Sequence, residues 1–375
     1  MTAFETRLVH PPPIEGEPSG ATSTPLYQTA TFAIGGDPAS ARWDYSRSGN
    51  PTRDVLEAQL AALDGASRAL AYTSGLAALA AVFSLARPGQ QIVVGDDLYG
   101  GTTRLLHRLE SRFGIVVRPV DTRSPAAVAE ALAHHPTALV FVETPSNPRL
   151  RPTDVSAIAG VTADRGVLLA VDNSMLSPYL YRPLDDGADL AVQSATKSLG
   201  GHGDLTAGVV TTRRETVASE LAFARNADGT ALAPFPCWLL LRGLETLAVR
   251  VDRQLVNTRA VLALLERHPA VERLHVPGNG PQPPVVSFET GDVAASRRLV
   301  AAARLFRTTV SFGGVTSSIS LPAEMSHAAV DPSERAARGL APDLIRVAVG
   351  IEHEDDLVAD LAAALDEACC LSRTR

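Results

Sequence analysis

Short apolar runs rich in β-branched residues alternate with amphipathic stretches of helical period between residue 52 and about residue 212. The runs predict strands over residues 68–72, 92–95, 115–120, 139–143, 168–172, 190–194 and 207–211. The stretches between them predict helices over residues 76–85, 102–113, 125–134 and 153–164. This alternation is typical of a mostly parallel sheet covered by helices on both faces, and such a sheet carries its functional site at the carboxyl ends of its strands.

Two other patterns flank this region. Residues 1–50 lack the alternation and read as an extended arm. The C-terminal part predicts one long helix over residues 236–266, strands near 285–289, 308–311 and 344–349, and helices near 293–305 and 355–368. We therefore expect an arm over residues 1–51, a large α/β domain over 52–235, and a small α/β domain over 236–375 that begins with the long linking helix.

Composition excludes several classes of protein. Of the 375 residues, 45% are apolar and 20% are charged, which is ordinary for a globular protein. The net charge of −7 comes without a basic stripe, which argues against nucleic acid as a partner. The apolar runs are far shorter than the ~18–20 residues that span a bilayer, which argues against a membrane. A start without a secretory pattern and three cysteines without a CxxC pair lead us to expect a cytoplasmic protein.

Lys197 is the single lysine of the sequence. Lysine and arginine together number 34, and 33 of these are arginine. Arginine can replace a lysine wherever only a solvated cation is needed. It cannot do so where an amine must lose its proton and attack a carbonyl, because a guanidinium stays protonated. Lys197 is therefore a candidate for covalent chemistry, although a lysine that survives by chance or fills a narrow packing site is an equal alternative from the count alone.

The residues around Lys197 favour the covalent alternative. One predicted strand ends at Asp172, and the next strand along the chain ends just before Ser194, Thr196 and Lys197. The carboxyl edge of the sheet brings this carboxylate and this amine into one cleft. Pyridoxal 5′-phosphate (PLP) needs both groups, because its aldehyde condenses with a lysine and its pyridine nitrogen needs an anion to stay protonated.

A place for the cofactor phosphate is also predicted. Residues 72–77 form the end of a strand, a turn of small residues that includes Gly75, and the start of a helix at Leu76. Backbone N–H groups at such a helix start bind phosphate. Each feature alone is common in α/β proteins, and an aspartate after a strand is more often a cap or a turn residue. The combination with the single lysine is much more specific.

Other chemistries find less support in the sequence. Residues 200–203 (GGHG) lack the GxGxxG spacing and precede no clear helix, so a dinucleotide-binding protein is the weaker, non-enzymatic alternative. No HExxH or CxxC motif predicts a metal site, and we expect none. No GxSxG elbow predicts a serine nucleophile, and Cys237 reads as a small core residue.

The sequence resembles the Cys/Met-metabolism PLP enzymes, which include cystathionine γ-synthase, cystathionine γ-lyase and methionine γ-lyase. The resemblance starts from Asp189–Leu190 and from residues 194–197 (SATK) and 199–203 (LGGHG). Further matches lie at residues 45–52, 98–102, 143–148, 171–173, 242–247, 310–314, 325–327 and 345–350. Ser198 departs from the aromatic residue or glutamine usual after the lysine. The resemblance implies the aspartate aminotransferase-like fold of PLP-dependent transferases (fold type I), with a seven-stranded sheet in the large domain.

The resemblance also implies roles for single residues. Tyr99 is expected to stack on the cofactor ring and to act as acid or base toward the leaving group. Asn147 is expected to form a hydrogen bond with the 3′ oxygen of the cofactor. Arg346 and Ser311 are expected to hold the α-carboxylate of an amino-acid substrate. Without the resemblance, Tyr99 would be a packing residue and Asn147 an Asx turn. A buried arginine in an apolar strand is costly without an anion, which agrees with the implied role of Arg346.

The arm has an implied role as well. Tyr45 and Arg47 resemble a pair that reaches from one subunit to the cofactor phosphate of its neighbour, whereas alone they would read as solvated loop residues. The resemblance therefore implies a homo-oligomer, which in this family is typically a dimer of dimers.

The substrate is predicted from three positions. Relatives that act on cystathionine usually carry a glutamate at the position of Val310, which points to an uncharged thioether and makes methionine γ-lyase the first hypothesis. Gly101 replaces the cysteine usual in methionine γ-lyases, and Arg104 resembles the cystathionine enzymes. Cystathionine γ-lyase or γ-synthase is therefore the second hypothesis, and O-acylhomoserine sulfhydrylase the third.

Overall fold

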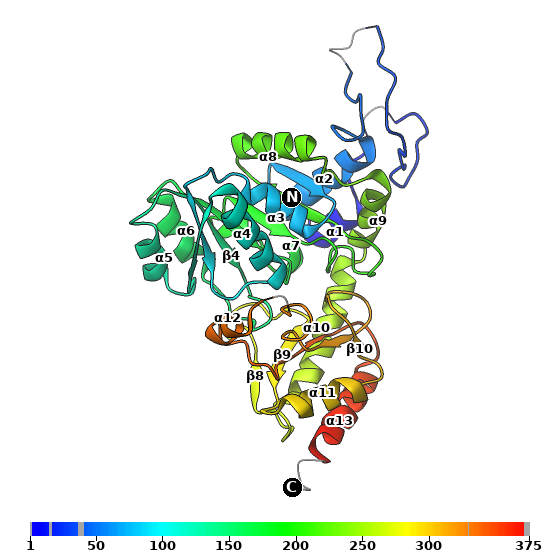
Figure 1. The fold of residues 1–375 in the computed structure, drawn as a ribbon. Helices are drawn as coiled ribbons and strands as arrows, with labels where there is room; N and C mark the ends of the chain where they lie inside the picture. Colours follow the sequence, from blue (N-terminus) through cyan, green and yellow to red (C-terminus); the bar gives the residue numbers. More distant parts are fainter. Residues whose placement is uncertain (1, 15–16, 37–40, 329, 371–375) are drawn as a thin grey trace.

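The computed structural model describes residues 2–14, 17–36, 41–328 and 330–370, apart from the side chains of Cys369 and Cys370. The described residues form two α/β bodies, each built around its own sheet, with the N-terminal arm projecting from the larger body (Figure 1). Of the three cysteines, Cys237 is free and buried, and the side chains of Cys369 and Cys370 lie outside the described part.

The larger sheet has seven strands in the order β1-β7-β6-β5-β4-β2-β3. Its strands are β1 (Arg68–Tyr72), β2 (Gln91–Gly95), β3 (Val116–Val120), β4 (Thr137–Glu143), β5 (Leu168–Asp172), β6 (Leu190–Gln193) and β7 (Gly208–Thr212). β7 pairs antiparallel with both β1 and β6, while β6, β5, β4, β2 and β3 pair in parallel. The predicted fold class and all seven strands are confirmed.

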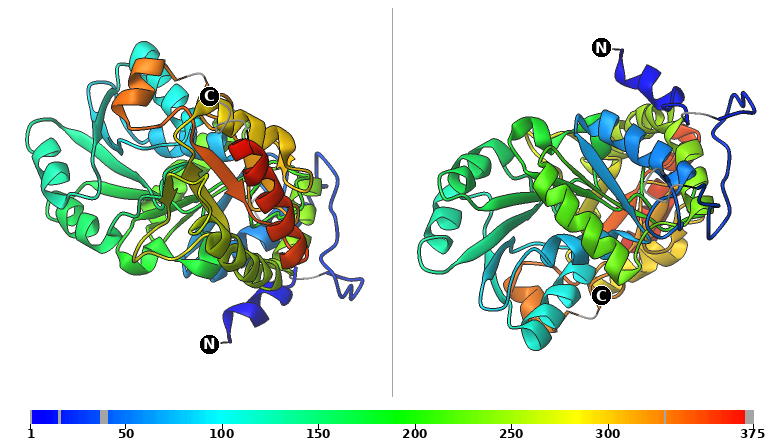
Figure 2. Two further views of the ribbon diagram at one scale, coloured as in Figure 1. Left: turned by 90° about the horizontal axis from the view of Figure 1, so that it is seen from below. Right: turned by 90° about the horizontal axis from the view of Figure 1, so that it is seen from above.

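Helices cover both faces of this sheet (Figure 2). They are α2 (Pro51–Asp64), α3 (Gly75–Phe83), α4 (Gly100–Phe113), α5 (Pro125–Ala131), α6 (Val155–Ala163), α7 (Ser177–Leu180) and α8 (Glu215–Asp228), with a 3-10 turn, η2, at Pro183–Asp186. In β4, Phe141 belongs to the core that includes residues of α3, α4 and α8, and its neighbours Val140 and Val142 belong to the core that includes residues of α5 and α6. Alternate side chains of a central strand thus enter two different cores. None of the described helices is long and apolar enough to cross a membrane.

The smaller sheet has the order β10-β11-β12-β9-β8. Its strands are β8 (Arg273–His275), β9 (Val285–Glu289), β10 (Arg307–Thr308), β11 (Ser318–Ser320) and β12 (Ile345–Ala348), and its helices are α11 (Val293–Ala302), α12 (Pro332–Ala337) and α13 (Glu354–Cys370). The core of this body includes Val286, Phe288, Ile319, Val347 and Leu361, all of which are fully buried. β8, β11 and α12 were not predicted, because they are short and have no clear period.

The long linking helix predicted over residues 236–266 is instead two helices, α9 (Pro234–Leu244) and α10 (Leu247–Leu265). A continuous helix would need the Gly243 carbonyl to accept a bond from residue 247. Here that carbonyl accepts from the Arg250 guanidinium at 2.7 Å. A β-carbon at position 243 would also lie 2.5 Å from the Gly200 carbonyl oxygen, so α9 is pressed against the turn that follows Lys197. The break therefore comes from tertiary contacts.

Two other local predictions differ from the structure. The arm is not wholly extended, because α1 (Phe4–Val9) buries Leu8 against α2. The strand predicted over residues 308–311 ends at Thr308, and the chain turns away at Ser311, whose φ of 86° is incompatible with a strand. The helices α2 and α8 were also missing from the prediction.

A buried carboxyl joins α2 to β6 and β7, the two strands on either side of the turn that carries Lys197 (the lysine turn). Oδ2 of Asp64 accepts hydrogen bonds from Gln193 at 2.8 Å and from Thr211 at 2.7 Å. Its Oδ1 has no partner. Burial raises the pKa of Asp64 to about 6, and the two hydrogen bonds only partly offset this effect.

We predict that the Asp64→Asn variant becomes more stable relative to the wild type as the pH rises. The folded protein holds a proton on Asp64 that the unfolded chain releases between about pH 4 and about pH 6, so the free energy of unfolding of the wild type falls across this window. The difference in that free energy between Asp64→Asn and wild type should grow by ~2 kcal/mol from about pH 4 to about pH 7. Denaturant titrations at both pH values measure it, with the exposed Glu220→Gln as the control. A constant difference would contradict the prediction.

Candidate active site

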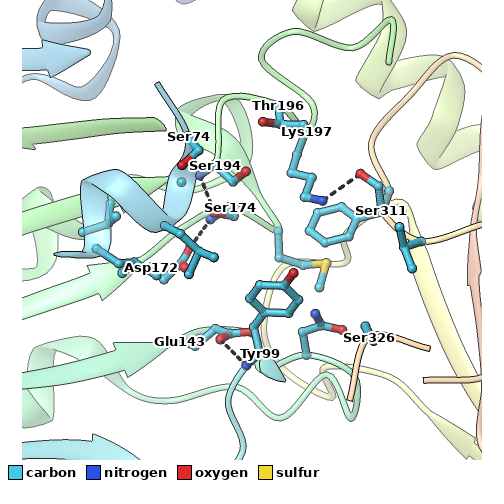
Figure 3. Close-up of a pocket in the computed structure, with 18 of the residues that line it drawn as sticks. Ser74, Tyr99, Glu143, Asp172, Ser174, Ser194, Thr196, Lys197, Ser311 and Ser326 are labelled. Carbon is cyan, nitrogen blue, oxygen red and sulfur yellow. Dashed lines mark hydrogen bonds between the residues drawn. The ribbon is translucent and has the colours of Figure 1, made fainter. Parts of the chain in front are cut away.

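A cavity of about 400 Å³ lies at the carboxyl ends of the large sheet's strands, where segments of the smaller body close it. Figure 3 shows its central side chains. The lining residues are Ser74, Gly75, Leu76, Leu79, Tyr99, Arg104, Glu143, Asn147, Asp172, Ser174, Met175, Val192, Ser194, Thr196, Lys197, Thr206, Val310, Ser311, Phe312, Met325, Ser326 and Arg346.

Lys197 enters the cavity from the turn after β6. Its backbone N–H donates to the Ser194 carbonyl at 3.0 Å, and its Nζ donates to Ser311 Oγ at 2.7 Å (Figure 3). Burial lowers the pKa of the Lys197 amine to about 8. The positive charge of Arg346 acts in the same direction, and the Asp172 carboxylate opposes it. The amine therefore loses its proton far more easily than that of an ordinary lysine.

Ser311 and Arg346 form the wall opposite the large sheet. Arg346, on β12, donates to Asn147 Oδ1 at 2.9 Å and to the Ser311 carbonyl at 2.9 Å. Its Nε is buried and has no partner, and none of the ion pairs among the described residues includes this guanidinium. Ser311 adopts a φ of 86°, which is strained for a residue with a β-carbon. A buried cation bonded only to neutral acceptors is suited to bind an incoming carboxylate.

Asp172 ends β5 at the bottom of the cavity. Its Oδ1 accepts from the Ser174 N–H at 2.8 Å, and Ser174 Oγ accepts from the Ser194 N–H at 2.6 Å. Burial raises the pKa of Asp172, while the Ser174 bonds and the Lys197 charge act against this rise. The Ser174 side chain thus ties the end of β5 to the start of the lysine turn (Figure 3).

The start of α3 forms a narrow cradle for an anion. Ser74 caps this helix by accepting from the Ala77 N–H, which leaves the N–H groups at Gly75 and Leu76 without intrahelical acceptors. A β-carbon at position 75 would lie 2.9 Å from Cβ of Ser194, so only glycine lets the helix start approach the lysine turn this closely. The N–H groups and the nearby serine hydroxyl suit a phosphate.

Tyr99 precedes α4 and is fixed by a second buried carboxyl. Glu143 faces Asp172 in the pairing of β4 with β5, and its Oε2 accepts from the Tyr99 N–H at 2.9 Å. Burial and the neighbouring Asp172 charge raise the pKa of Glu143 well above its ordinary value. The Tyr99 side chain projects into the cavity below Lys197 (Figure 3) and is 36% exposed.

The cavity mouth carries Arg104 and Val310. Arg104 lies one turn into α4, and none of the hydrogen bonds or ion pairs described for the chain involves its guanidinium. Val310 is 52% exposed beside Ser311 and brings no charge. The mouth therefore offers a cation and an apolar surface to the distal part of a ligand.

Tyr45 and Arg47 lie away from this cavity. The Arg47 guanidinium packs over the Tyr45 ring at 5.5 Å, and its Nη1 donates to the Asn226 carbonyl at 3.1 Å. Neither residue lines the cavity of its own chain. Tyr45 is 43% exposed on the arm, where a second chain could reach it.

The structure brings the remaining predicted site residues together. They are Gly75, Leu76, Tyr99, Arg104, Asn147, Asp172, Ser194, Thr196, Lys197, Val310, Ser311 and Arg346. Sequence reasoning gave no role to Ser174, Glu143 or Phe312. Glu143 carries the signal that identified Asp172, since it also ends a buried strand. Phe312 lies within one of the matched segments, but no pattern predicts that the Lys197 amine lies over its ring at 4.8 Å.

Comparisons with known proteins point to one family of enzymes. Residues 5–366 match the family model described as Cys/Met metabolism PLP-dependent enzyme. The chain is 46% identical to the chloroplastic cystathionine β-lyase of Arabidopsis thaliana over 93% of this chain and 78% of that one. It is 43% identical to the cystathionine β-lyase of Neurospora crassa over 95% of this chain and 80% of that one.

A solved structure of similar fold is the cystathionine γ-lyase from Lactobacillus plantarum in complex with L-serine. It superposes with a TM-score of 0.94 at 38% identity and covers 98% of this chain and 99% of that chain. The match extends over nearly the whole length in sequence and in structure, and the chain belongs to the Cys/Met metabolism PLP-dependent enzyme family.

Proposed function

We propose that the protein is a carbon–sulfur lyase that cleaves L-cystathionine by β-elimination, with water, to homocysteine, pyruvate and ammonia. The family acts on sulfur amino acids with PLP, by β- or γ-elimination. The observation that carries the choice of cystathionine is the unpaired Arg104 guanidinium at the cavity mouth, which suits the distal carboxylate of this substrate. The names of the relatives from Arabidopsis thaliana and Neurospora crassa support the same choice.

The residues of the cavity fit PLP. Gly75 and Leu76 at the start of α3 would bind the phosphate, the buried Asp172 carboxylate would pair with the pyridine nitrogen, and Lys197 would hold the aldehyde carbon. When bound, the cofactor supplies an electron sink that stabilises negative charge at the substrate Cα.

The other steps belong to the protein's own side chains. We assign the substrate α-carboxylate to Arg346, whose Nε is unpartnered, and to Ser311 beside it. The free Lys197 amine would be placed to remove the Cα proton of the substrate, since its lowered pKa makes the neutral form more accessible than in an ordinary lysine. Tyr99 is placed to deliver a proton to the leaving sulfur. β-Elimination needs only these two proton transfers, whereas γ-elimination also needs removal of a Cβ proton.

Methionine γ-lyase, the first hypothesis from the sequence, is the second candidate. Val310 favours it, because this exposed apolar side chain offers no anion to the distal ammonium of cystathionine. Burying an ammonium without a partner costs several kcal/mol. The methyl thioether of methionine carries no such cost. The two candidates therefore depend on opposite properties of the mouth, a cation at Arg104 and an apolar patch at Val310.

We further propose that the arm, over residues 1–51, completes the phosphate site of a neighbouring copy. The cations that line the cavity are Arg104, Lys197 and Arg346, and both Lys197 and Arg346 bond to Ser311, on the wall away from the start of α3. The phosphate would then meet N–H groups and hydroxyls of its own chain without a cation. Arg47 of a second chain would supply that charge, which implies a homo-oligomer.

Formation of the cofactor complex should depend on the ionisation of Lys197. A base whose pKa is lowered to about 8 is mostly neutral above that pH, so the rate of reaction with added PLP should reach a plateau there. Below it, the rate should fall about tenfold for each pH unit. Stopped-flow absorbance of the unloaded protein measures this rate, with N-acetyl-lysine as the reference amine. A rate that keeps rising to about pH 10 would show an ordinary lysine.

Arg104→Ala should separate the two candidate substrates. Loss of a partly exposed carboxylate contact should lower kcat/KM for cystathionine at least about tenfold and change that for methionine by less than about threefold. Keto acid and thiol release from cystathionine, methionine and an O-acylhomoserine measure these values. Arg108→Ala, one turn along α4 and outside the cavity, is the control. Wild-type preference for methionine, unchanged in Arg104→Ala, would replace the first candidate by the second.

Mixing two inactive variants should test the role of the arm. A hybrid dimer of Arg47→Ala and Lys197→Ala chains has one site in which both the lysine and the arginine are intact, if Arg47 serves its neighbour. Such mixtures should regain up to about a quarter of the wild-type activity once subunits have exchanged at random, because half of the dimers are hybrids with one working site in two. Mixtures as inactive as the separate variants would place Arg47 in its own subunit's site.

A further inference from the structure

We propose that His327 is a positioning residue for Tyr99. His327 follows β11 of the smaller body and reaches the turn before α4 of the larger one. It contacts both the backbone before Tyr99 and the Tyr99 ring, and so fixes the direction in which the phenol enters the cavity. The inference adds to the proposed function, on which it rests for the catalytic meaning of Tyr99.

The His327 ring is buried and its hydrogen bonds define its tautomer. It is 4% exposed, with Nε2 at 3.2 Å from the Leu98 carbonyl oxygen and Nδ1 at 2.9 Å from Ser326 Oγ. A carbonyl only accepts, so Nε2 carries the proton and Nδ1 accepts from the Ser326 hydroxyl. Burial lowers the pKa of His327 to about 4, and the ring is neutral at neutral pH. The Leu98 carbonyl therefore has a fixed partner directly before Tyr99.

The second contact is with the tyrosine ring itself. The His327 and Tyr99 rings are perpendicular, at 90°, with their centroids 6.4 Å apart. Such an edge-to-face arrangement is favourable between π-systems. The Tyr99 ring also lies against Gly101, where a β-carbon would be 2.4 Å from Cε1 of the ring. The phenol is thus in contact with the His327 ring and with the bare backbone of Gly101.

The segment that carries His327 is firmly placed against the larger body. A β-carbon at Gly100 would lie 2.5 Å from the Ser326 carbonyl oxygen, so the two backbones are in direct contact. Arg335 donates to the carbonyl oxygens of His327 at 3.2 Å and Val330 at 2.7 Å, which holds the loop in shape. Glu143 accepts a hydrogen bond from the Tyr99 N–H at 2.9 Å. Through its contacts with the Leu98 carbonyl and the Tyr99 ring, His327 therefore fixes the phenol relative to the smaller body.

Two substitutions separate the contacts of His327. His327→Phe keeps an aromatic ring and removes the donor to Leu98, while His327→Gln keeps a donor and removes the ring. Both should lower kcat about tenfold and change KM less than about threefold, because the phenol is misdirected while substrate binding is intact. In a Tyr99→Phe background the same substitutions should change kcat by less than about twofold. Arg338→Gln, which removes a bond from the same segment to Thr103 on α4, is the matched structural control.

A direct measure of the Tyr99 ring distinguishes failure of this inference from failure of the proposed function. In protein containing 3-fluorotyrosine, the ¹⁹F resonance missing from Tyr99→Phe identifies Tyr99. His327→Phe should shift or broaden this resonance, and Arg338→Gln should leave it unchanged. An unchanged resonance in His327→Phe, or a loss of kcat that persists in the Tyr99→Phe background, would overturn the positioning role. A shifted resonance with full activity in Tyr99→Phe would keep the positioning role and refute the catalytic one.

Discussion

Four ionisable groups buried at the carboxyl edge of the large sheet constrain the rest of the site. Lys197 and Arg346 bring positive charge to one wall, and Asp172 and Glu143 end neighbouring strands at facing positions below them. Glu143 and Arg346 are buried and Asp172 and Lys197 are half-buried, so the ionisation of each group depends on the charge of its neighbours. The positive charge of Arg346 and burial together lower the pKa of Lys197, and the Asp172 carboxylate limits that effect. The Arg346 charge that is suited to bind a substrate carboxylate therefore also makes the amine easier to deprotonate, and the Asp172 charge acts against it.

The fold serves this arrangement by bringing distant chain segments to one edge. Asp172 and Lys197 come from adjacent parallel strands, whose ends Ser174 ties together. Arg346 comes from a separate sheet, and its bonds to Asn147 and to the Ser311 carbonyl join the two bodies at the cavity. The strained φ of Ser311 directs its hydroxyl to Lys197 and its carbonyl to Arg346. One strained residue thus connects the Lys197 amine to the Arg346 guanidinium.

Sequence reasoning could find the groups that carry their own signal. Lys197 was visible because it is the single lysine, and Asp172 because it ends a buried strand. The helix break before α10 was not visible, because its cause is the Arg250 guanidinium on the Gly243 carbonyl and the contact of Gly243 with Gly200. The contact of His327 with Tyr99 joins residues more than 200 positions apart, and no local period encodes it. The local sequence pattern therefore predicts the strands and the candidate reactive residues, whereas contacts between the two bodies determine how those residues are arranged in the cavity.

The proposed substrate preference depends on how the residues at the cavity mouth interact with the distal carboxylate and the distal ammonium of cystathionine. The inner cavity holds groups suited to any amino acid, because all substrates of the family share the α-carboxylate and the α-amine and react with the same cofactor. Discrimination must come from the outer residues, where Arg104 can attract a distal carboxylate and Val310 cannot neutralise a distal ammonium. The exposed mouth leaves that ammonium partly in water, which reduces the cost of lacking an anion. A distal carboxylate would gain a guanidinium that has no other partner among the described residues, and this difference is the physical reason for proposing cystathionine rather than methionine as the substrate.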